Sequence, residues 1–176
     1  MMSTMRDQIY GKEQSAVGRF LEYKGGLALD SIDSYDAEGG YFEYVESKVQ
    51  MSRLDGLIYE RFPEGSGRHL AAGVEIKWRR FDLPTLMTQH NGEMLMPADK
   101  LLAGQTLAYA FGVPTLLLYL LDDCLLVQKV VAGNGDKVNV IREIYELSNR
   151  TIEGGIIQRK NCYIKTEGAE KIPLGL

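Results

Sequence analysis

The chain has 176 residues, of which 45% are hydrophobic and 25% are charged, proportions that are typical of a globular protein. This length predicts a single domain over residues 1–176 and excludes a fibrous or disordered chain. With 24 acidic and 20 basic residues the net charge is −4, which excludes the strongly basic class of nucleic-acid-binding proteins. Any contact with phosphates must therefore come from a local basic cluster or a bound cation.

No segment has the composition of a signal peptide or a membrane span. Residues 1–7 lack an apolar core, and the longest apolar run, Val113–Leu121, contains Pro114 and is far shorter than the roughly 20 residues that cross a bilayer. Cys124 and Cys162 form no CxxC motif, so we expect two buried thiols in a reducing compartment. These observations predict a cytoplasmic protein without membrane association.

The first half of the chain predicts one helix and three strands. Residues 12–24 are expected to be helical because Val17, Phe20 and Leu21 recur at helical spacing. Three strands are expected to follow and to form a meander: Tyr41–Lys48, Arg53–Glu60 and Ala71–Arg80.

The second half predicts a helix and several strands after a long connection. Phe81–Pro97 has no firm period and is predicted to be a loop with room for a short helix. A helix is predicted over Ala98–Phe111, followed by a buried strand over Thr115–Leu121 and its antiparallel partner over Leu125–Val131. A hairpin turn is predicted at residues 134–136. The remaining predictions are a strand or helix over Val138–Glu146 and an edge strand over Ile156–Lys165. The order αβββαβ predicts an α/β fold with a mixed central β-sheet flanked by helices.

Three charged residues interrupt strands that are otherwise apolar: Asp55, Glu75 and Lys77. Charges seldom lie in central strands unless they are paired or bind a metal. Glu75 and Lys77 are two residues apart on one strand, so they share a face, while Ile76 faces the core. If the second and third strands pair, Asp55 reaches the same space.

This combination of side chains predicts a divalent metal site. Two carboxylates about 4 Å apart repel by roughly 4 kcal/mol at an effective dielectric of 20, and a divalent cation removes that cost. Hard oxygen ligands favour Mg²⁺ or Mn²⁺. A lysine beside a metal-bound water orients that water for attack on a phosphodiester.

Asp55 followed by Glu75-Ile76-Lys77 resembles the signature D…(D/E)xK of the PD-(D/E)xK nuclease superfamily, which has a restriction-endonuclease-like core. Gln105 and Tyr109 in the next predicted helix are similar to the QxxxY motif of its RecB-like branch. The resemblance covers about 100 residues. It departs from the family at Leu54, where a proline is usual, and in the absence of a histidine from the first helical region.

The resemblance implies a Mg²⁺- or Mn²⁺-dependent deoxyribonuclease. Asp55, Glu75 and the Ile76 carbonyl would ligate the metal, and Lys77 would position the attacking water. It further implies a set of supporting residues: Gln105 and Tyr109 toward the substrate, and a glutamate of the first helix, Glu22 or else Glu13, at the metal. Apart from the resemblance, Lys77, Arg79 and Arg80 form a local basic cluster, in which Arg79 is a candidate phosphate contact. DNA is the expected partner, and a homodimer is expected to cover the apolar strand Thr115–Leu121. A compact core of this kind suggests a phage or mobile-element enzyme.

Other interpretations stay open at this point. Glu75 and Lys77 can be an ordinary ion pair on a solvated sheet face, which is worth about 0–1 kcal/mol. The chain can also be a nuclease-fold protein that binds nucleic acid or a protein partner without cutting, or a hydrolase of another phosphoester. The sequence does not decide between endonucleolytic and exonucleolytic cleavage, or between duplex, single-stranded and branched DNA.

Overall fold

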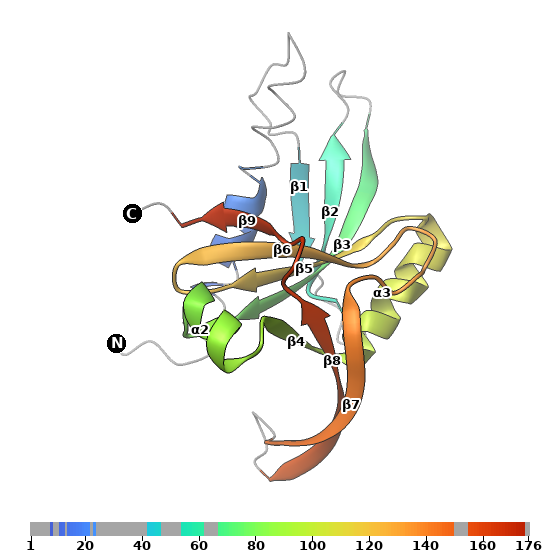
Figure 1. The fold of residues 1–176 in the computed structure, drawn as a ribbon. Helices are drawn as coiled ribbons and strands as arrows, with labels where there is room; N and C mark the ends of the chain where they lie inside the picture. Colours follow the sequence, from blue (N-terminus) through green and yellow to red (C-terminus); the bar gives the residue numbers. More distant parts are fainter. Residues whose placement is uncertain are drawn as a thin grey trace.

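The computed structural model describes residues 8, 11–12, 14–21, 23, 42–46, 54–61, 67–149 and 155–174. They form a mixed α/β fold with a curled six-stranded sheet and a separate three-stranded sheet (Figure 1). The larger sheet has the strand order β1 (Phe42–Glu46), β2 (Gly56–Arg61), β3 (Arg68–Trp78), β5 (Thr115–Leu120), β6 (Cys124–Val131) and β9 (Glu170–Pro173). The smaller sheet has the order β4 (Glu93–Pro97), β8 (Ile156–Lys165) and β7 (Val140–Asn149).

The helices in the described ranges are the first helix, whose longest continuous described stretch is residues 14–21, α2 (Leu83–Gln89) and α3 (Ala98–Phe111). The bounds of α3 agree with the sequence-based prediction. Gly112 ends this helix in a left-handed conformation with φ 69°, and its N–H donates to the Ala108 carbonyl.

The predicted meander of the first three strands is confirmed, because β1 pairs with β2 and β2 with β3, both antiparallel. The other edge of β3 pairs in parallel with β5, so the larger sheet is mixed. The chain between these two partners contains α2, β4 and α3. β3 is thus an internal strand with a hydrogen-bonded neighbour on each side.

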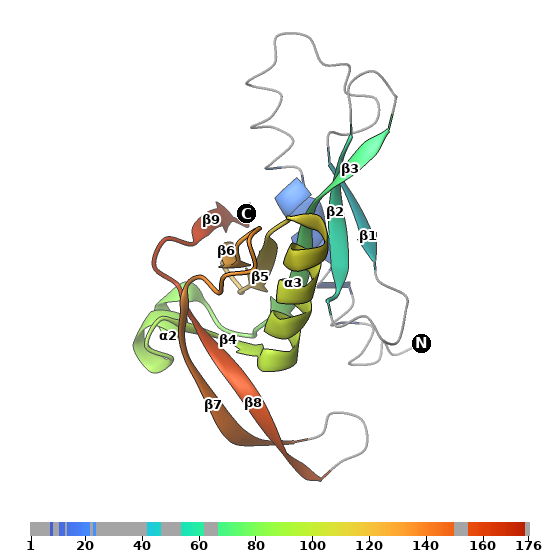
Figure 2. The same ribbon diagram turned by 90° about the vertical axis from the view of Figure 1, so that its right-hand side faces the viewer.

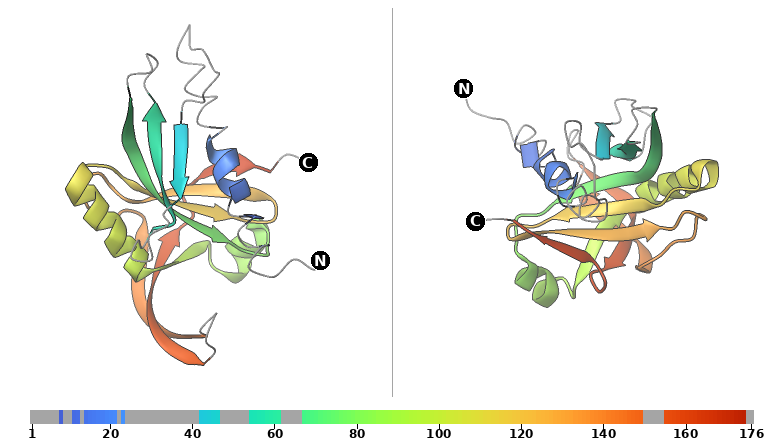
Figure 3. Two further views of the ribbon diagram at one scale, coloured as in Figure 1. Left: turned by 180° about the vertical axis from the view of Figure 1, so that it is seen from behind. Right: turned by 90° about the horizontal axis from the view of Figure 1, so that it is seen from above.

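The alternation of β3 divides the interior into two cores. Val74 and Ile76 are buried against the first helix, on the face that also carries Leu118 and Leu120 of β5. Leu117 and Tyr119 lie on the opposite face and pack with α3 and the smaller sheet. Seen from above (Figure 3, right), the larger sheet runs between the first helix and α2. Because residues two apart share a face, Glu75 and Lys77 point toward the α3 side.

The prediction of a loop over Phe81–Pro97 is wrong for most of its length. Asp82 caps α2 by accepting a hydrogen bond from the Thr85 N–H at 2.9 Å, and the room left for a short helix is filled by this element. Only Leu86 of α2 is buried, so the helix has no apolar period to detect. β4 is short, but its alternate residues Met94 and Met96 are fully buried.

Three further expectations need correction. β2 begins at Gly56, so Asp55 precedes the strand instead of lying within it. The strand over Ile156–Lys165 is central in the smaller sheet, with β4 on one side and β7 on the other, and is not an edge. The turn at residues 134–136 forms, and an isolated bridge joins Val131 of β6 to Lys137, which precedes β7. β6 and β7 themselves lie in different sheets. Val138–Glu146, left undecided, lies largely in strand β7.

The two cysteines, Cys124 and Cys162, are buried free thiols, as expected. Burial raises the pKa of each thiol to about 11, so neither is a reactive thiolate at neutral pH. In the described part of the chain no helix is both long enough and apolar enough to span a membrane.

Candidate metal and nucleic-acid site

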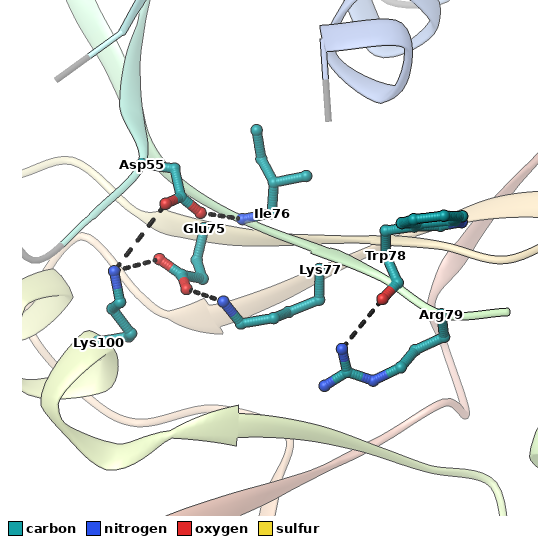
Figure 4. Close-up of polar contacts among 7 residues, drawn as sticks. All are labelled: Asp55, Glu75, Ile76, Lys77, Trp78, Arg79 and Lys100. Carbon is teal, nitrogen blue, oxygen red and sulfur yellow. Dashed lines mark hydrogen bonds and ion pairs between the residues drawn. The ribbon is translucent and has the colours of Figure 1, made fainter. Parts of the chain in front are cut away.

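Four charged side chains meet where β2 begins, on the α3 side of β3 (Figure 4). Asp55 comes from the bend before β2, Glu75 and Lys77 from β3, and Lys100 from the first turn of α3. These elements belong to the meander and to the crossover that leads to β5. The group therefore joins segments that are distant in sequence.

Asp55 is fixed by the backbone of β3. Its N–H donates to the Val74 carbonyl at 3.0 Å, and its Oδ2 accepts a hydrogen bond from the Ile76 N–H at 2.7 Å. The backbone groups of Val74 and Ile76 thus point to the same edge of β3, and Ile76 lies beyond Gly56, the first residue of β2. Strand alternation directs the Ile76 carbonyl to that edge as well, beside the Asp55 carboxylate.

Glu75 is a charged side chain with no solvent exposure. Its Oε1 accepts a hydrogen bond from Lys77 Nζ, and its Oε2 lies 3.2 Å from Lys100 Nζ. Burial raises the pKa of the Glu75 carboxyl to about 7, although the charge of Lys77 lowers it, the nearby Asp55 carboxylate raises it further and Lys100 lowers it. The carboxyl group is therefore poised between its neutral and charged forms at neutral pH.

The complete burial of Glu75 removes one alternative. An ion pair on a solvated sheet face requires both partners to be in water, whereas only Lys77 retains exposure, at 21% of its side chain. The pair is instead part of an interior cluster. Buried ion pairs are weak contributors to stability and need a further reason to be present.

Lys100 is a site residue that the sequence analysis missed. Its Nζ lies between the two carboxylates, 3.2 Å from Glu75 Oε2 and 3.9 Å from Asp55 Oδ1. The signal for it was its position in the first turn of a predicted helix, where the helix dipole disfavours a cation. A lysine in that position is stabilised by a carboxylate partner that lies outside the helix.

The donor atoms fit a hard divalent cation. Asp55 and Glu75 supply carboxylate oxygens, and the Ile76 carbonyl points to the same edge. Among the described residues buried Glu75 Oε2 accepts no hydrogen bond, and its charge is met there by the ion pair with Lys100 Nζ at 3.2 Å. Within those residues no cluster of three or more His, Cys, Asp or Glu side chains could hold a metal ion. Mg²⁺ accepts such a set, because it keeps several of its own waters when few carboxylates bind it.

Lys77 of β3 and Arg79, the residue that follows the strand, point to the same side of the sheet as Glu75 (Figure 4). Arg79 Nη1 donates to the Trp78 carbonyl at 3.0 Å, and its guanidinium lies 5.5 Å from the centroid of the Tyr119 ring. No carboxylate in the described ranges lies within ion-pair distance of Arg79. Its charge is thus available to a ligand.

Gln105 and Tyr109 lie farther along α3 and contact the turn after β6. Gln105 Nε2 donates to the Gly135 carbonyl at 2.9 Å, and Tyr109 packs so closely on Gly135 that a Cβ there would come within 2.3 Å of its ring. Tyr109 keeps 72% of its surface exposed. The structure therefore places both residues at this turn and apart from the carboxylates, and a role toward the substrate stays a prediction for each.

Glu22 and Glu13, the candidate ligands from the first helix, lie outside the described residues. The described part of that helix, including Ala16, Val17 and Phe20, covers the face of the sheet opposite Glu75.

Comparison of the chain with protein-family models, with curated proteins and with solved structures finds no match. The geometry of this cluster is therefore the basis for assigning a function to the protein.

Proposed function

We propose that this protein is a Mg²⁺- or Mn²⁺-dependent nuclease that hydrolyses phosphodiester bonds in DNA. One observation carries the proposal: the fully buried carboxylate of Glu75 shares a cation with Asp55 at the end of a strand ladder. In this structure the shared cation is the Lys100 ammonium. Two carboxylates arranged around one positive charge are what a divalent ion would require.

The topology supports a restriction-endonuclease-like core. The meander β1–β2–β3, the helix α3 and the parallel strand β5 follow the order expected of that core, with α2 and β4 inserted. Asp55 directly before β2, and Glu75-Ile76-Lys77 on β3, then correspond in order to the signature of the PD-(D/E)xK nucleases. The superfamily assignment remains part of the proposal.

The residues have distinct tasks in this proposal. Asp55, Glu75 and the Ile76 carbonyl would hold the metal ion, which supplies an acidified water and stabilises negative charge on the phosphate when it is bound. Lys77 is a cation and cannot ligate a metal, so it orients the water and stabilises the charge of the phosphorane. Lys100 occupies the space between the carboxylates and therefore competes with a divalent ion for the same oxygens.

A test compares linear, circular and branched DNA with Mg²⁺ or Mn²⁺ and then with EDTA. Asp55→Asn and Glu75→Gln should abolish cleavage. Glu143→Gln is a matched control, because Glu143 is also held by two lysines, Lys137 and Lys160, but on the smaller sheet. Undiminished cleavage in excess EDTA, or wild-type cleavage by both site variants, would overturn the proposal.

A second candidate function is nucleic-acid or protein binding without cleavage. Two lysines already balance the two carboxylates, which is the arrangement that a site without a metal needs. The same assay distinguishes the two functions, because this candidate requires that the protein bind a partner while all the DNA substrates stay intact with either metal.

A further inference from the structure

A pocket of about 360 Å³ opens beyond the C-terminal end of β3, between this strand and the smaller sheet. Its walls come from the segment between β3 and α2, from the end of α2 and the turn after it, and from β4, β5, β7 and β8. The lining includes Arg79, Phe81, His90, Tyr119, Arg142 and Tyr163. Sites for small organic ligands have volumes of about 300–1,000 Å³. The pocket is thus large enough for one nucleotide.

The pocket carries a positive charge. Arg142 is paired with Glu93, its Nη2 lying 2.6 Å from Glu93 Oε2, and its guanidinium lies 4.1 Å from the centroid of the Tyr163 ring. Arg79 adds a second guanidinium group, and no carboxylate in the described ranges lies within ion-pair distance of it. Because guanidinium groups bind phosphate oxygens in a bidentate way, this surplus favours a phosphate-bearing ligand.

The same pocket presents flat aromatic groups. Phe81 and His90 are stacked with ring centroids 4.7 Å apart. The buried ring of Tyr119 supports the Arg79 guanidinium from beneath, and Tyr163 supports that of Arg142, so the guanidinium planes face the pocket. Rings and guanidinium planes are the surfaces on which nucleobases stack. Charge and aromatic surface together fit a nucleotide better than an inorganic anion or an apolar molecule.

The position of the pocket relates it to the candidate metal site. Arg79 directly follows the last residue of β3, where its N–H still donates to the Leu120 carbonyl of β5, and its side chain points to the same side as that of Lys77 (Figure 4). Two residues of extended chain separate the two positions by roughly 6–7 Å. Tyr119 is the register partner of Lys77 on β5. This step is comparable to the spacing of successive phosphates along a nucleic acid strand. A strand whose reacting phosphate lies beside Lys77 would therefore bring the adjoining nucleotide to the pocket.

Resting on the proposed nuclease function, we propose that this pocket binds the nucleotide next to the scissile phosphate, with its base unpaired. A concave pocket with stacking surfaces receives a base that has left the helix stack, whereas the base faces in a duplex are covered by their neighbours. The substrate is accordingly single-stranded DNA or an unpaired end, and duplex DNA is the weaker ligand.

The test measures the binding of a fluorescein-labelled 12-nucleotide single strand by anisotropy in EDTA, so that cleavage is not needed. Arg79→Gln should weaken binding about tenfold and reduce the slope of log Kd against log salt by about 0.7, the value for one lost phosphate contact on a single strand. Leu95→Trp fills the pocket without a change of charge, since Leu95 lines it. It should weaken binding about tenfold with the salt slope unchanged.

Arg159→Gln is the matched control, because Arg159 is an exposed arginine of β8 that does not line the pocket. Its affinity for the single strand should stay within about twofold of wild type, as expected for a surface charge away from the ligand. Wild-type affinity in both Arg79→Gln and Leu95→Trp, or an equal loss with the duplex of the same sequence, would overturn the pocket assignment. If the two variants lose affinity as expected but wild-type protein cuts no DNA with Mg²⁺ or Mn²⁺, the nuclease function fails and the nucleotide pocket stands.

Discussion

The Asp55 carboxylate continues the hydrogen bonding along β3 at the point where β2 begins. It satisfies the Ile76 N–H, which has no β2 residue to pair with, while its other oxygen faces Lys100. The choice of substitution at this position therefore matters. Asp55→Asn retains an acceptor for the Ile76 N–H and loses the charge, whereas Asp55→Ala removes both and leaves a partly buried donor without a partner.

The roles of the two lysines can be separated by matched substitutions, since both are paired with Glu75 in the metal-free protein. Lys77→Ala should lower single-turnover cleavage by about 10²-fold or more, as expected when an electrostatic or acid–base group is lost. Its Mn²⁺ affinity should be unchanged or somewhat tighter, because a cation has been removed beside the carboxylates. Calorimetric titration with Mn²⁺ beside single-turnover rates measures both quantities.

Lys100→Ala should give the reverse pattern. Lys100 lies between the carboxylates, so its removal should tighten Mn²⁺ binding more than Lys77→Ala does, with a much smaller loss of cleavage. Equal rates for Lys77→Ala and wild type would reduce Lys77 to a structural partner of Glu75. Weaker Mn²⁺ binding by Lys100→Ala would show that Lys100 supports the metal instead of competing with it.

Glu75 makes the stability of the metal-free protein depend on pH. Its pKa rises from 4.5 to about 7 on folding, chiefly through burial. Below pH 4.5 the group is protonated in both states; between pH 4.5 and 7 it ionises in the unfolded chain but stays protonated in the folded one. Its contribution therefore lowers the free energy of unfolding as the pH rises through this window, and it adds no further change above pH 7.

Urea unfolding of wild type and Glu75→Gln in EDTA, at pH values from 4.5 to 8, measures this contribution. The stability of Glu75→Gln relative to wild type should increase up to about pH 7 and then level off. A constant difference would mean that the carboxyl group keeps an ordinary pKa in the folded protein.

The sequence was sufficient to predict that Glu75 and Lys77 share a face, because side chains alternate along a strand. That Asp55 joins them depended on the pairing of the second and third strands, which the structure shows. Lys100 was not predictable by the same rule, since its place depends on how α3 packs against β3. The position of the Ile76 carbonyl could be predicted only in part. Alternation along β3 predicts the edge of the strand to which this carbonyl points, but the pairing with β2 is needed to show that no β2 residue covers that edge beside Asp55.

At the scale of elements, strands and helices with an apolar pattern were predictable and short elements that are defined by their neighbours were not. β3 and α3 have clear patterns and were predicted close to their bounds. α2 depends on a cap at Asp82 and buries a single residue, and β4 is recognisable only from its pairing with β8. Because β4 was missed, β8 was misjudged as an edge.

The packing of α3 on β5 depends on a glycine. A Cβ at Gly104 would lie 2.6 Å from Thr115 Oγ1 and 3.0 Å from its Cβ. In an ordinary helix Gly→Ala stabilises by about 1 kcal/mol, but Gly104→Ala should destabilise by about 1–3 kcal/mol, because α3 must move away from the sheet. Chemical denaturation measures the loss.

Thr115→Ala in the same background should recover part of that loss. Thr115 Oγ1 is buried and has no hydrogen-bond partner among the described residues, so its removal leaves no polar group unsatisfied. A double-mutant cycle should give a coupling between the two substitutions of about 0.5 kcal/mol or more. Strict additivity would mean that the helix does not press on β5 at this point.

At the scale of the whole molecule, the two sheets share one core. Leu117 and Tyr119 of the larger sheet pack in the same cluster as Met94, Cys162 and Ile164 of the smaller one. The hairpin of β7 and β8 extends from this body but begins within it (Figure 2). The described residues therefore favour one cooperative unit.

One unit should unfold in one transition. Trp78, the single tryptophan of the chain, reports on the core beneath the first helix, and far-ultraviolet circular dichroism reports on all the strands and helices. The two signals should give coincident urea transitions, as two-state unfolding requires. Separate midpoints would assign the larger and smaller sheets to independent units.

The homodimer was expected because a second subunit would cover the apolar strand Thr115–Leu121, and the structure shows that no such cover is needed. β5 is covered by the chain itself, and Leu117, Leu118, Tyr119 and Leu120 are all buried without a second subunit. A dimer stays a prediction, and light scattering over a concentration series measures it directly.

The parallel pairing of β3 with β5 has a consequence for biosynthesis. The strand that carries Glu75 and Lys77 leaves the ribosome before residues 79–114, so one of its edges has no partner until the whole crossover has been made. During this interval the nascent chain exposes an unpaired, largely apolar strand, which is a template for intermolecular association. Charges that point from the face of such a strand discourage this pairing. The same two residues that are proposed to hold a metal and a water in the mature protein would thus protect the growing chain from aggregation.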